Sequence, residues 1–180
     1  MPSLVGSEMC IRDRSNSMTD GSNSSATSSD ITVSDEAKPV IVSAVTGDAN
    51  SDGTVDRLTL TFSESVDIAD GGTDNDITLA ASTGSASITA GSYGATASTL
   101  VYTISGATAG NTSLTIDPTY AVSGAGDITD PTGNEMANGE TVSGSDGAAP
   151  VLLSATYKDT NGNGTVNRID AVYSEAITSS

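Results

Sequence analysis

The chain has 180 residues, which is room for one domain and part of a second, and its 23 Asp and Glu against 6 Lys and Arg give a net charge of −17. Such a surface excludes nucleic acid and anionic membranes as partners, because phosphate binding needs clustered Lys and Arg. There is no His, no Trp and a single Phe. No apolar run approaches the roughly 18 residues of a membrane helix, so we expect no membrane insertion in this chain.

Residues 1–34 are expected to be an adapter artefact followed by a disordered linker. The stretch LVGSEMCIRDR, residues 4–14, resembles in every residue one reading frame of a transposase adapter used in sequencing libraries. A signal peptide would continue into an apolar segment, whereas the polar SNSMTDGSNSSATSSD follows. The only cysteine, Cys10, therefore carries no information on redox compartment. We also expect the natural start to be missing, so the lack of a signal peptide says nothing about secretion.

Short segments with period-2 alternation of apolar and polar residues predict β-strands throughout residues 35–145. In one of them, Leu58, Leu60 and Phe62 share a face while the residues between them are polar. Gly, Asn and Asp punctuate the gaps, as turns require, and no helical spacing is sustained. About seven strands in about 110 residues predict an all-β, Greek-key β-sandwich. The predicted strands are 39–46, 57–62, 77–81, 85–90, 99–104, 113–116 and 140–143.

The loop after the first predicted strand carries oxygen-bearing residues at alternate positions. Asp48, Asn50, Asp52, Thr54 and Asp56 occupy positions 1, 3, 5, 7 and 9 of an EF-hand-like calcium loop, with glycine at position 6. Three carboxylates so close together repel one another unless a cation neutralises them, which favours calcium as a cofactor. The Glu of position 12 is absent and a strand follows instead of a helix, so a plain Asp-Gly turn remains the alternative.

A second acidic stretch, DITDPTGNE at residues 127–135, predicts a turn. Asp130 and Asn134 can accept bonds from local backbone amides, the proline presets its own dihedral angle, and Gly-Asn tolerates positive φ. A metal role is the weaker alternative here.

The chain also repeats itself, without a gap, at an offset of 111 residues. GDANSDGTVDRLTLTFSESV begins at Gly47 and its copy KDTNGNGTVNRIDAVYSEAI begins at Lys158. The period suits one sandwich domain and is too long for a solenoid repeat. We therefore predict a complete domain at 35–145, the first copy, and a truncated one at 146–180, the second copy, which holds only its opening hairpin. The copied loop, residues 159–170, has fewer charges, so any calcium site there should be weaker or absent.

The repeat suggests what the calcium loop does. In a seven-strand sandwich the first and last strands end at the same pole, so the loop at 48–56 should lie where the chain leaves for the next copy. Asp146, in the six-residue connection 145–150, could then complete the ligand set. We expect a bound ion to stiffen the junction between copies.

Four segments in this order, PVIVSAV, DGTVDRLTLTFSESV, DITDPTGNEMA and SDGAAPVLLSA, resemble the bacterial immunoglobulin-like repeats of large surface and S-layer-type proteins. The resemblance covers residues 35–180. It implies an extracellular or cell-surface, immunoglobulin-like sandwich repeated in series, with a structural or adhesive role. The partners it implies are neighbouring repeats of the same chain and a surface glycan or protein ligand.

The residue inventory predicts that the chain is not an enzyme. Without His, and without Cys outside the adapter-like stretch, Ser-His and Cys-His nucleophiles are excluded. The alternative function is an accessory glycan- or wall-binding module of a secreted hydrolase, although the missing Trp argues against a sugar platform. The parent reading frame separates the two: further copies at this period favour a surface stalk, and an adjoining catalytic domain favours the accessory module.

Overall fold

The structure is a computed structural model in which residues 33–68, 76–92, 97–121 and 128–178 are described. They belong to two units, of which the first includes residues 33–37 and the second begins at Lys38. In the first unit, residues 33–37 have no regular secondary structure, and the Ala37 N–H donates to Asp35 Oδ1 over 2.9 Å. The adapter-like stretch and most of the predicted linker lie outside the described residues.

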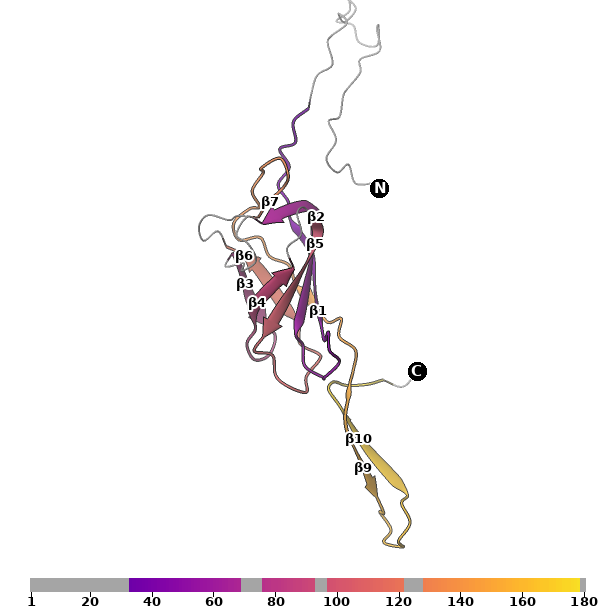
Figure 1. The fold of residues 1–180 in the computed structure, drawn as a ribbon. Coiled ribbons are helices and arrows are strands. Elements are labelled where there is room, and N and C mark those ends of the chain that lie inside the picture. Colours follow the sequence, from indigo (N-terminus) through magenta and orange to yellow (C-terminus); the bar gives the residue numbers. More distant parts are fainter. Residues whose placement is uncertain (1–32, 69–75, 93–96, 122–127, 179–180) are drawn as a thin grey trace, which may run out of the picture. The chain divides into compact units, whose positions relative to one another are not determined.

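All regular secondary structure in the described part of the second unit is β-strand, so the predicted all-β class is confirmed (Figure 1). A mixed six-stranded sheet has the order β4 (Ser87–Ser92), β5 (Ala97–Ser105), β2 (Arg57–Ile68), β1 (Ile41–Gly47) and β8 (Gly144–Ser145), and β7 (Ile128–Thr129) pairs with the end of β2. Two further antiparallel pairs are β3 (Ile77–Ala81) with β6 (Ile116–Tyr120), and β9 (Leu152–Lys158) with β10 (Arg168–Tyr173).

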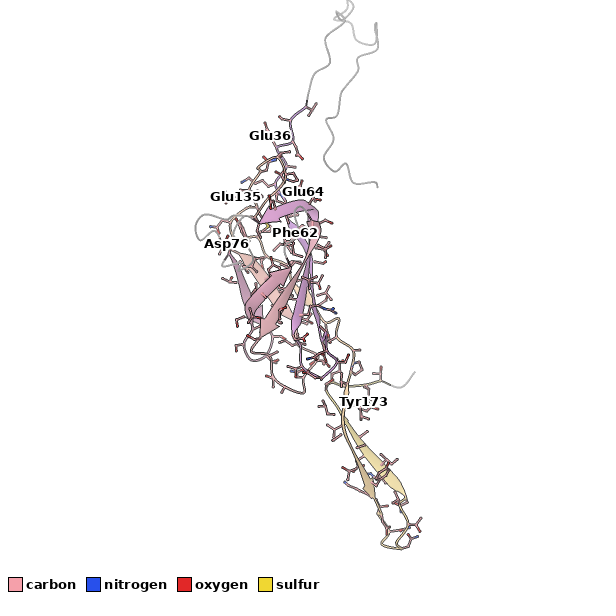
Figure 2. The ribbon with its side chains drawn as sticks, in the orientation of Figure 1. Glu36, Phe62, Glu64, Asp76, Glu135 and Tyr173 are labelled. Atoms are coloured by element: carbon pink, nitrogen blue, oxygen red, sulfur yellow. The ribbon has the colours of Figure 1, made fainter. Side chains whose placement is uncertain are left out.

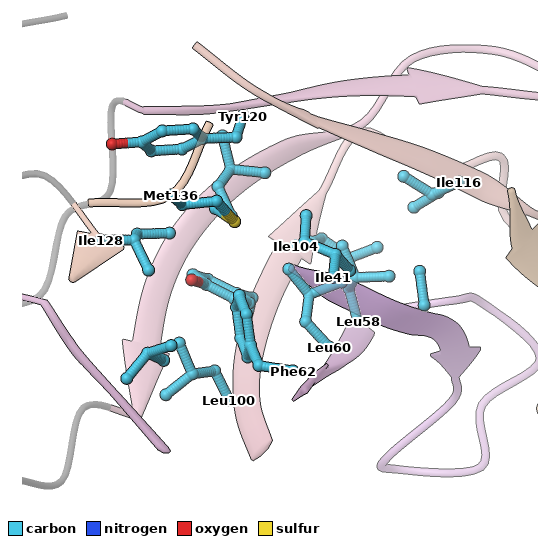
Figure 3. Packing of buried hydrophobic residues seen from close by; sticks show 14 of the residues in the cluster. Ile41, Leu58, Leu60, Phe62, Leu100, Ile104, Ile116, Tyr120, Ile128 and Met136 are labelled. Atoms are coloured by element: carbon cyan, nitrogen blue, oxygen red, sulfur yellow. The ribbon is translucent and has the colours of Figure 1, made fainter. Parts of the chain in front are cut away.

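One apolar core lies between the six-stranded sheet and the β3–β6 pair (Figure 3). The predicted inward face of β2 is confirmed, because Leu58, Leu60 and Phe62 are all buried. Each aliphatic or aromatic side chain removed from water in this way contributes about 1.5–3 kcal/mol. The other strands add alternate residues to the same cluster: Ile41, Ala44, Ile77, Leu100, Tyr102, Ile104, Ile116, Tyr120 and Ile128.

The first and last strands of the six-stranded sheet in chain order, β1 and β8, are neighbours in the sheet. Strand β1 pairs antiparallel with β2 and parallel with β8, where Ala44 is the partner of Gly144 and Val45 that of Ser145. Because parallel neighbours run in one direction, the loop after β1 and the connection after β8 start at the same end of the sheet. Gly147 lies directly against β1, since a methyl group there would meet Val45 Cγ1 at 2.4 Å.

Two strand predictions were wrong in their bounds. The segment 113–116 was predicted as a strand, but β6 begins only at Ile116 and continues through Pro118 to Tyr120. Proline is tolerated because β6 has a continuous ladder only with β3, and its other side has a single bridge, between Thr119 and Thr141. In the segment 140–143 the structure has only a single bridge at Thr141, and the pairing strand is β8, just beyond it.

The second hairpin, β9–β10, repeats the geometry of the first. Every residue pair of β9 and β10 is the β1–β2 pair moved by 111 positions, including the irregularity at the Leu152–Tyr173 pair, which corresponds to Ile41–Phe62. Phe62 and Tyr173 are the equivalent residues labelled in Figure 2. Burial differs sharply, since Leu58 is 0% exposed and its equivalent Ile169 is 62% exposed. The apolar face of the hairpin is therefore buried in the first copy and exposed to solvent in the second.

This difference leads to a matched pair of substitutions. Leu58→Ala should lower the free energy of unfolding by about 2–5 kcal/mol, because it leaves a cavity in the core. Ile169→Ala, at the equivalent position, should change it by less than about 0.5 kcal/mol, because the side chain is already in water. Urea denaturation followed by circular dichroism measures both, and equal losses would contradict the different burial of the two hairpins.

Candidate functional site: two equivalent loops and a joint

The loop after β1 is folded around carboxylates that accept backbone N–H groups. Asp48 Oδ2 accepts the N–H of Gly53 over 2.7 Å, and Asp48 Oδ1 accepts that of Asp52 over 3.3 Å. Across the base of the loop, Asp56 Oδ1 accepts the N–H of Ala49 over 2.7 Å. These bonds lie within the loop and reverse the chain direction between β1 and β2, and a bridge between Thr54 and Asn111 joins the loop to the rest of the copy.

The middle of the loop is a chain of short-range polar contacts. Asn50 Oδ1 accepts the N–H of Asp52 over 3.0 Å, and Asn50 Nδ2 donates to Asp52 Oδ2 over 3.0 Å. Asp52 Oδ1 in turn accepts the N–H of Thr54 over 2.8 Å. Gly53 follows with φ of +88°, a conformation that favours glycine because it has no Cβ.

The five predicted calcium ligands, Asp48, Asn50, Asp52, Thr54 and Asp56, thus lie in one loop. Their oxygens have the hard chemistry that calcium prefers. The carboxylate oxygens of the three aspartates do not all lie within 4.8 Å of one another, so the loop would have to contract around an ion. The predicted additional ligand Asp146 accepts the N–H of Ala148 over 3.0 Å, within its own connection. The calcium site stays a prediction.

The copied loop after β9 repeats four of the hydrogen bonds of the first loop. Asp159 Oδ2 accepts the N–H of Gly164 over 2.7 Å, as Asp48 does that of Gly53. The Gly164 bond, joined by the N–H groups of residues 161 to 163, holds the pKa of Asp159 below its usual value against a smaller effect of burial. Asn167 Oδ1 accepts the N–H of residue 160 over 3.0 Å, in the place of Asp56. Asparagine can replace aspartate in these roles because the contacts need only an oxygen.

Asp170, at position 12 of the copied loop, is held by two cations. Its carboxylate forms ion pairs with Lys158 and Arg168, and these lower the pKa of Asp170, with the Lys158 hydrogen bond as the largest cause. A carboxylate neutralised in this way has less charge to offer an ion. Whether the second loop binds calcium stays open.

The predicted turn at the second acidic stretch is confirmed around Asp130. This side chain is only 2% exposed, and it accepts the N–H of Thr132 over 2.9 Å and that of Asn134 over 2.7 Å. Burial, the largest single effect, raises the pKa of Asp130, but the four hydrogen bonds from Asn134 and Thr132 together lower it below its usual value. Gly133 has φ of +92°, as expected for the Gly-Asn position. Asp127 lies outside the described residues.

The second hairpin packs against the first copy through three docking residues: Val151, Leu153 and Ser174. They meet an acceptor surface made of Gly53, Gly110 and Thr112, and together these six residues form what we name the joint. Leu153 lies so close that a methyl group at Gly53 would meet its Cδ2 at 2.7 Å, and one at Gly110 its Cδ1 at 3.1 Å. The hydroxyl oxygens of Thr112 and Ser174 are 2.7 Å apart, and both residues are buried.

Sequence reasoning missed the joint. It assigned Gly53 to a turn, which is correct, but the residue also gives Leu153 a surface without a side chain. Ser174 matches Ser63 in the repeat, and each accepts a backbone N–H 23 residues earlier, at Val151 and Val40 respectively. The only available signal was that Ser174 keeps this residue type at the offset of 111.

No protein-family model, no curated protein and no solved structure matches the chain. Within the part of the chain that the structure describes, no helix has the length and apolar character needed to cross a membrane. What the chain does must therefore be inferred from the geometry of its own loops and joint.

The Asp130 turn gives a prediction about pH. Because the folded pKa lies below the ordinary value of 3.8, the Asp130 carboxylate stabilises the fold above that pH, and this stabilisation is lost as pH falls through the folded pKa. Asp130→Ala should cost about 1–3 kcal/mol at neutral pH, since the partly buried N–H groups of Thr132 and Asn134 lose a charged acceptor.

The cost of Asp130→Ala should shrink when urea unfolding is repeated at a pH low enough to protonate the wild-type carboxyl group in the folded state. Asp67→Ala, on an exposed side chain of β2, is the control and should change the unfolding free energy by less than about 0.5 kcal/mol. A cost for Asp130→Ala that is the same at both pH values would contradict the role of the charge.

Proposed function

We propose that this chain is a structural or adhesive repeat module of a secreted or cell-surface bacterial protein, in which immunoglobulin-like β-sandwich domains follow one another in series. The single observation that carries the proposal is the joint. A second hairpin with the register and loop of the first lies directly against the first copy through Leu153 and Ser174.

Three features of the strands support an immunoglobulin-like sandwich at 35–145. The six-stranded sheet and the β3–β6 pair share one core, as two packed layers do. The first strand pairs with both its successor and the last strand of the copy. The open apolar face of β9–β10 is equivalent to the covered face of β1–β2, which is what the opening hairpin of another such domain would have.

The joint suits a serial arrangement because its two sides are different surfaces. A contact between unlike surfaces can be repeated along a chain without closing into a ring. The docking residues belong to the beginning of one copy, and the acceptor surface belongs to the loops of the copy before it. Each added copy would therefore be placed on its predecessor in the same way.

A disulfide trap tests the joint in the full chain with Cys10→Ser. Thr112→Cys with Ser174→Cys should form a disulfide in the folded protein, because the replaced hydroxyl oxygens are 2.7 Å apart. The bond should raise the free energy of unfolding by about 2–4 kcal/mol. Mass spectrometry after thiol labelling and urea denaturation measure the two effects.

The matched control for the trap is Thr108→Cys with Ser174→Cys. Thr108 lies in the same loop region as Gly110, but its Oγ1 is directed to Gly84, where an added methyl group would meet it at 3.1 Å. This pair should remain reduced under the same conditions. Equal oxidation of the two pairs would contradict the joint and, with it, the serial arrangement.

The proposal includes calcium at the loop that carries Gly53, one of the residues of the joint. Asp48, Asp52 and Asp56 bring three negative charges beside Gly53, and a bound cation would cancel their repulsion. Each carboxylate oxygen that accepts one N–H keeps a further lone pair for an ion. An ion held by Asp48 would act on Gly53 directly, because the two residues share the 2.7 Å hydrogen bond, and so would stiffen the junction.

Calcium should bind the full chain weakly, with a dissociation constant of about 10⁻⁴ to 10⁻³ M. At about ten times that concentration the free energy of unfolding should rise by about 1.4 kcal/mol. Titration calorimetry and thermal unfolding in calcium or chelator measure this. Asp48→Ala with Asp52→Ala should abolish the effect and Asp159→Ala, in the copied loop, should leave most of it. Identical unfolding curves in calcium and in chelator would contradict the calcium site.

A further inference from the structure

The first copy has three residues that are equivalent to the docking residues, and these three are exposed to solvent. Moved back by 111 positions, Val151, Leu153 and Ser174 correspond to Val40, Val42 and Ser63. Val40 and Ser63 are exposed, and Val42 is 56% exposed although it is a large apolar residue in a strand. Single exposed valines are ordinary, but here each has an equivalent that lies in a contact one period later.

The hydrogen bonds of the serine at this surface are also the same as those of the serine in the joint. Ser63 Oγ accepts the N–H of Val40 over 3.1 Å, and the Ser63 N–H donates to the Val40 carbonyl over 2.9 Å. Ser174 and Val151 form the same two bonds, at 2.8 and 2.9 Å. Ser174 Oγ accepts from Val151 and also bonds Thr112 Oγ1, a contact in which its own proton is available to donate. Ser63 has the same arrangement and the same proton to donate.

We propose that Val40, Val42 and Ser63 form a docking surface for the acceptor surface of another copy of this same fold, made of the residues equivalent to Gly53, Gly110 and Thr112. The partner is thus an identical domain bound head to tail. Val42 takes the place of Leu153 against the two glycines, and Ser63 donates to the threonine hydroxyl. This inference rests on the proposed function, because it takes the joint as the pattern for every neighbouring pair.

The wild-type chain should not associate by this route, because its own second hairpin already covers its acceptor surface. Removing the docking side chains should free that surface for the open end of a second molecule. Leu153→Asp with Ser174→Ala does so outside the core, since Leu153 is partly exposed and Ser174 lies at the joint. Unchanged circular dichroism and cooperative unfolding confirm that this variant is folded.

Covalent trapping between two full-length chains, both with Cys10→Ser, tests the proposal. One chain carries Thr112→Cys, Leu153→Asp and Ser174→Ala, and the other carries Ser63→Cys. Under mild oxidation they should form a mixed disulfide, visible on non-reducing gels. Adding Val42→Asp to the second chain should lower the initial rate at least about tenfold, because a carboxylate would be placed against the glycines without a partner.

Two controls decide between docking and random collision. Ser87→Cys, on exposed strand β4, replaces Ser63→Cys and should give at least about tenfold slower trapping, a loss of about 1.4 kcal/mol of effective affinity. Restoring Leu153 and Ser174 in the first chain should also slow the trapping, because the hairpin then covers position 112 again. Equal rates for the Ser63 and Ser87 variants, or a rate that Val42→Asp does not change, would overturn the proposal.

The intrachain trap separates this inference from the proposed function. If Thr112→Cys and Ser174→Cys form their disulfide within one chain while Ser63→Cys traps no second chain, the joint stands and the docking surface on the first copy is wrong. If the intrachain disulfide also fails, the serial arrangement itself is wrong.

Discussion

The backbone of Gly53 is the point on which the loop and the joint both depend. Its N–H donates to Asp48 Oδ2, which holds the loop after β1 in shape, and its other side lies against Leu153. A side chain at this position would disturb both, because φ is +88° and a methyl group would come within 2.7 Å of Leu153. Loop conformation and inter-copy contact are therefore coupled through one residue.

The two hairpins show how much of this geometry is local. β9–β10 has the register of β1–β2 although its apolar face is exposed, so the core that covers β1–β2 is not what determines the pairing. Isolated two-stranded hairpins are at best marginally stable in water. Here the turn is held by backbone bonds to Asp159, and the ion pair of Asp170 with Lys158 joins the two strands. Local contacts set the shape, and burial supplies the stability.

The difference between local contacts and packing of distant residues also explains which features could be predicted from sequence. Strand β2 was predicted because Leu58 and Leu60 alternate with polar residues, and the Asp130 turn because aspartate, glycine and asparagine have strong local preferences. Strand β6 was misplaced because Pro118 reads as a break unless its pairing with Leu79 of β3 is known. Strand β8 has only two residues, too few for an alternating pattern.

The joint could not have been predicted in the same way, because it is a contact between residues far apart in the chain. Thr112 and Ser174 are separated by 62 positions, and although Ser174 lies in the repeated segment, Thr112 belongs to no recognisable motif. Their approach depends on where the connection after β8 directs the chain, and that in turn depends on Gly147 lying against Val45. Local preference carries no information about such a contact.

In the proposed serial arrangement, the net negative charge opposes contact between copies while the joint favours it, and this difference would make their association selective. With a net charge of −17, two copies repel one another over most of their surface. All six residues of the joint are uncharged, and Leu153 with the two glycines offers apolar contact between residues that carry no charge of their own. Contacts elsewhere are discouraged by like charge, which selects one mode of association by disfavouring the others. The aspartates beside Gly53 then set how strongly even this contact is opposed, so the ionic state of one loop would govern how firmly neighbouring copies are held.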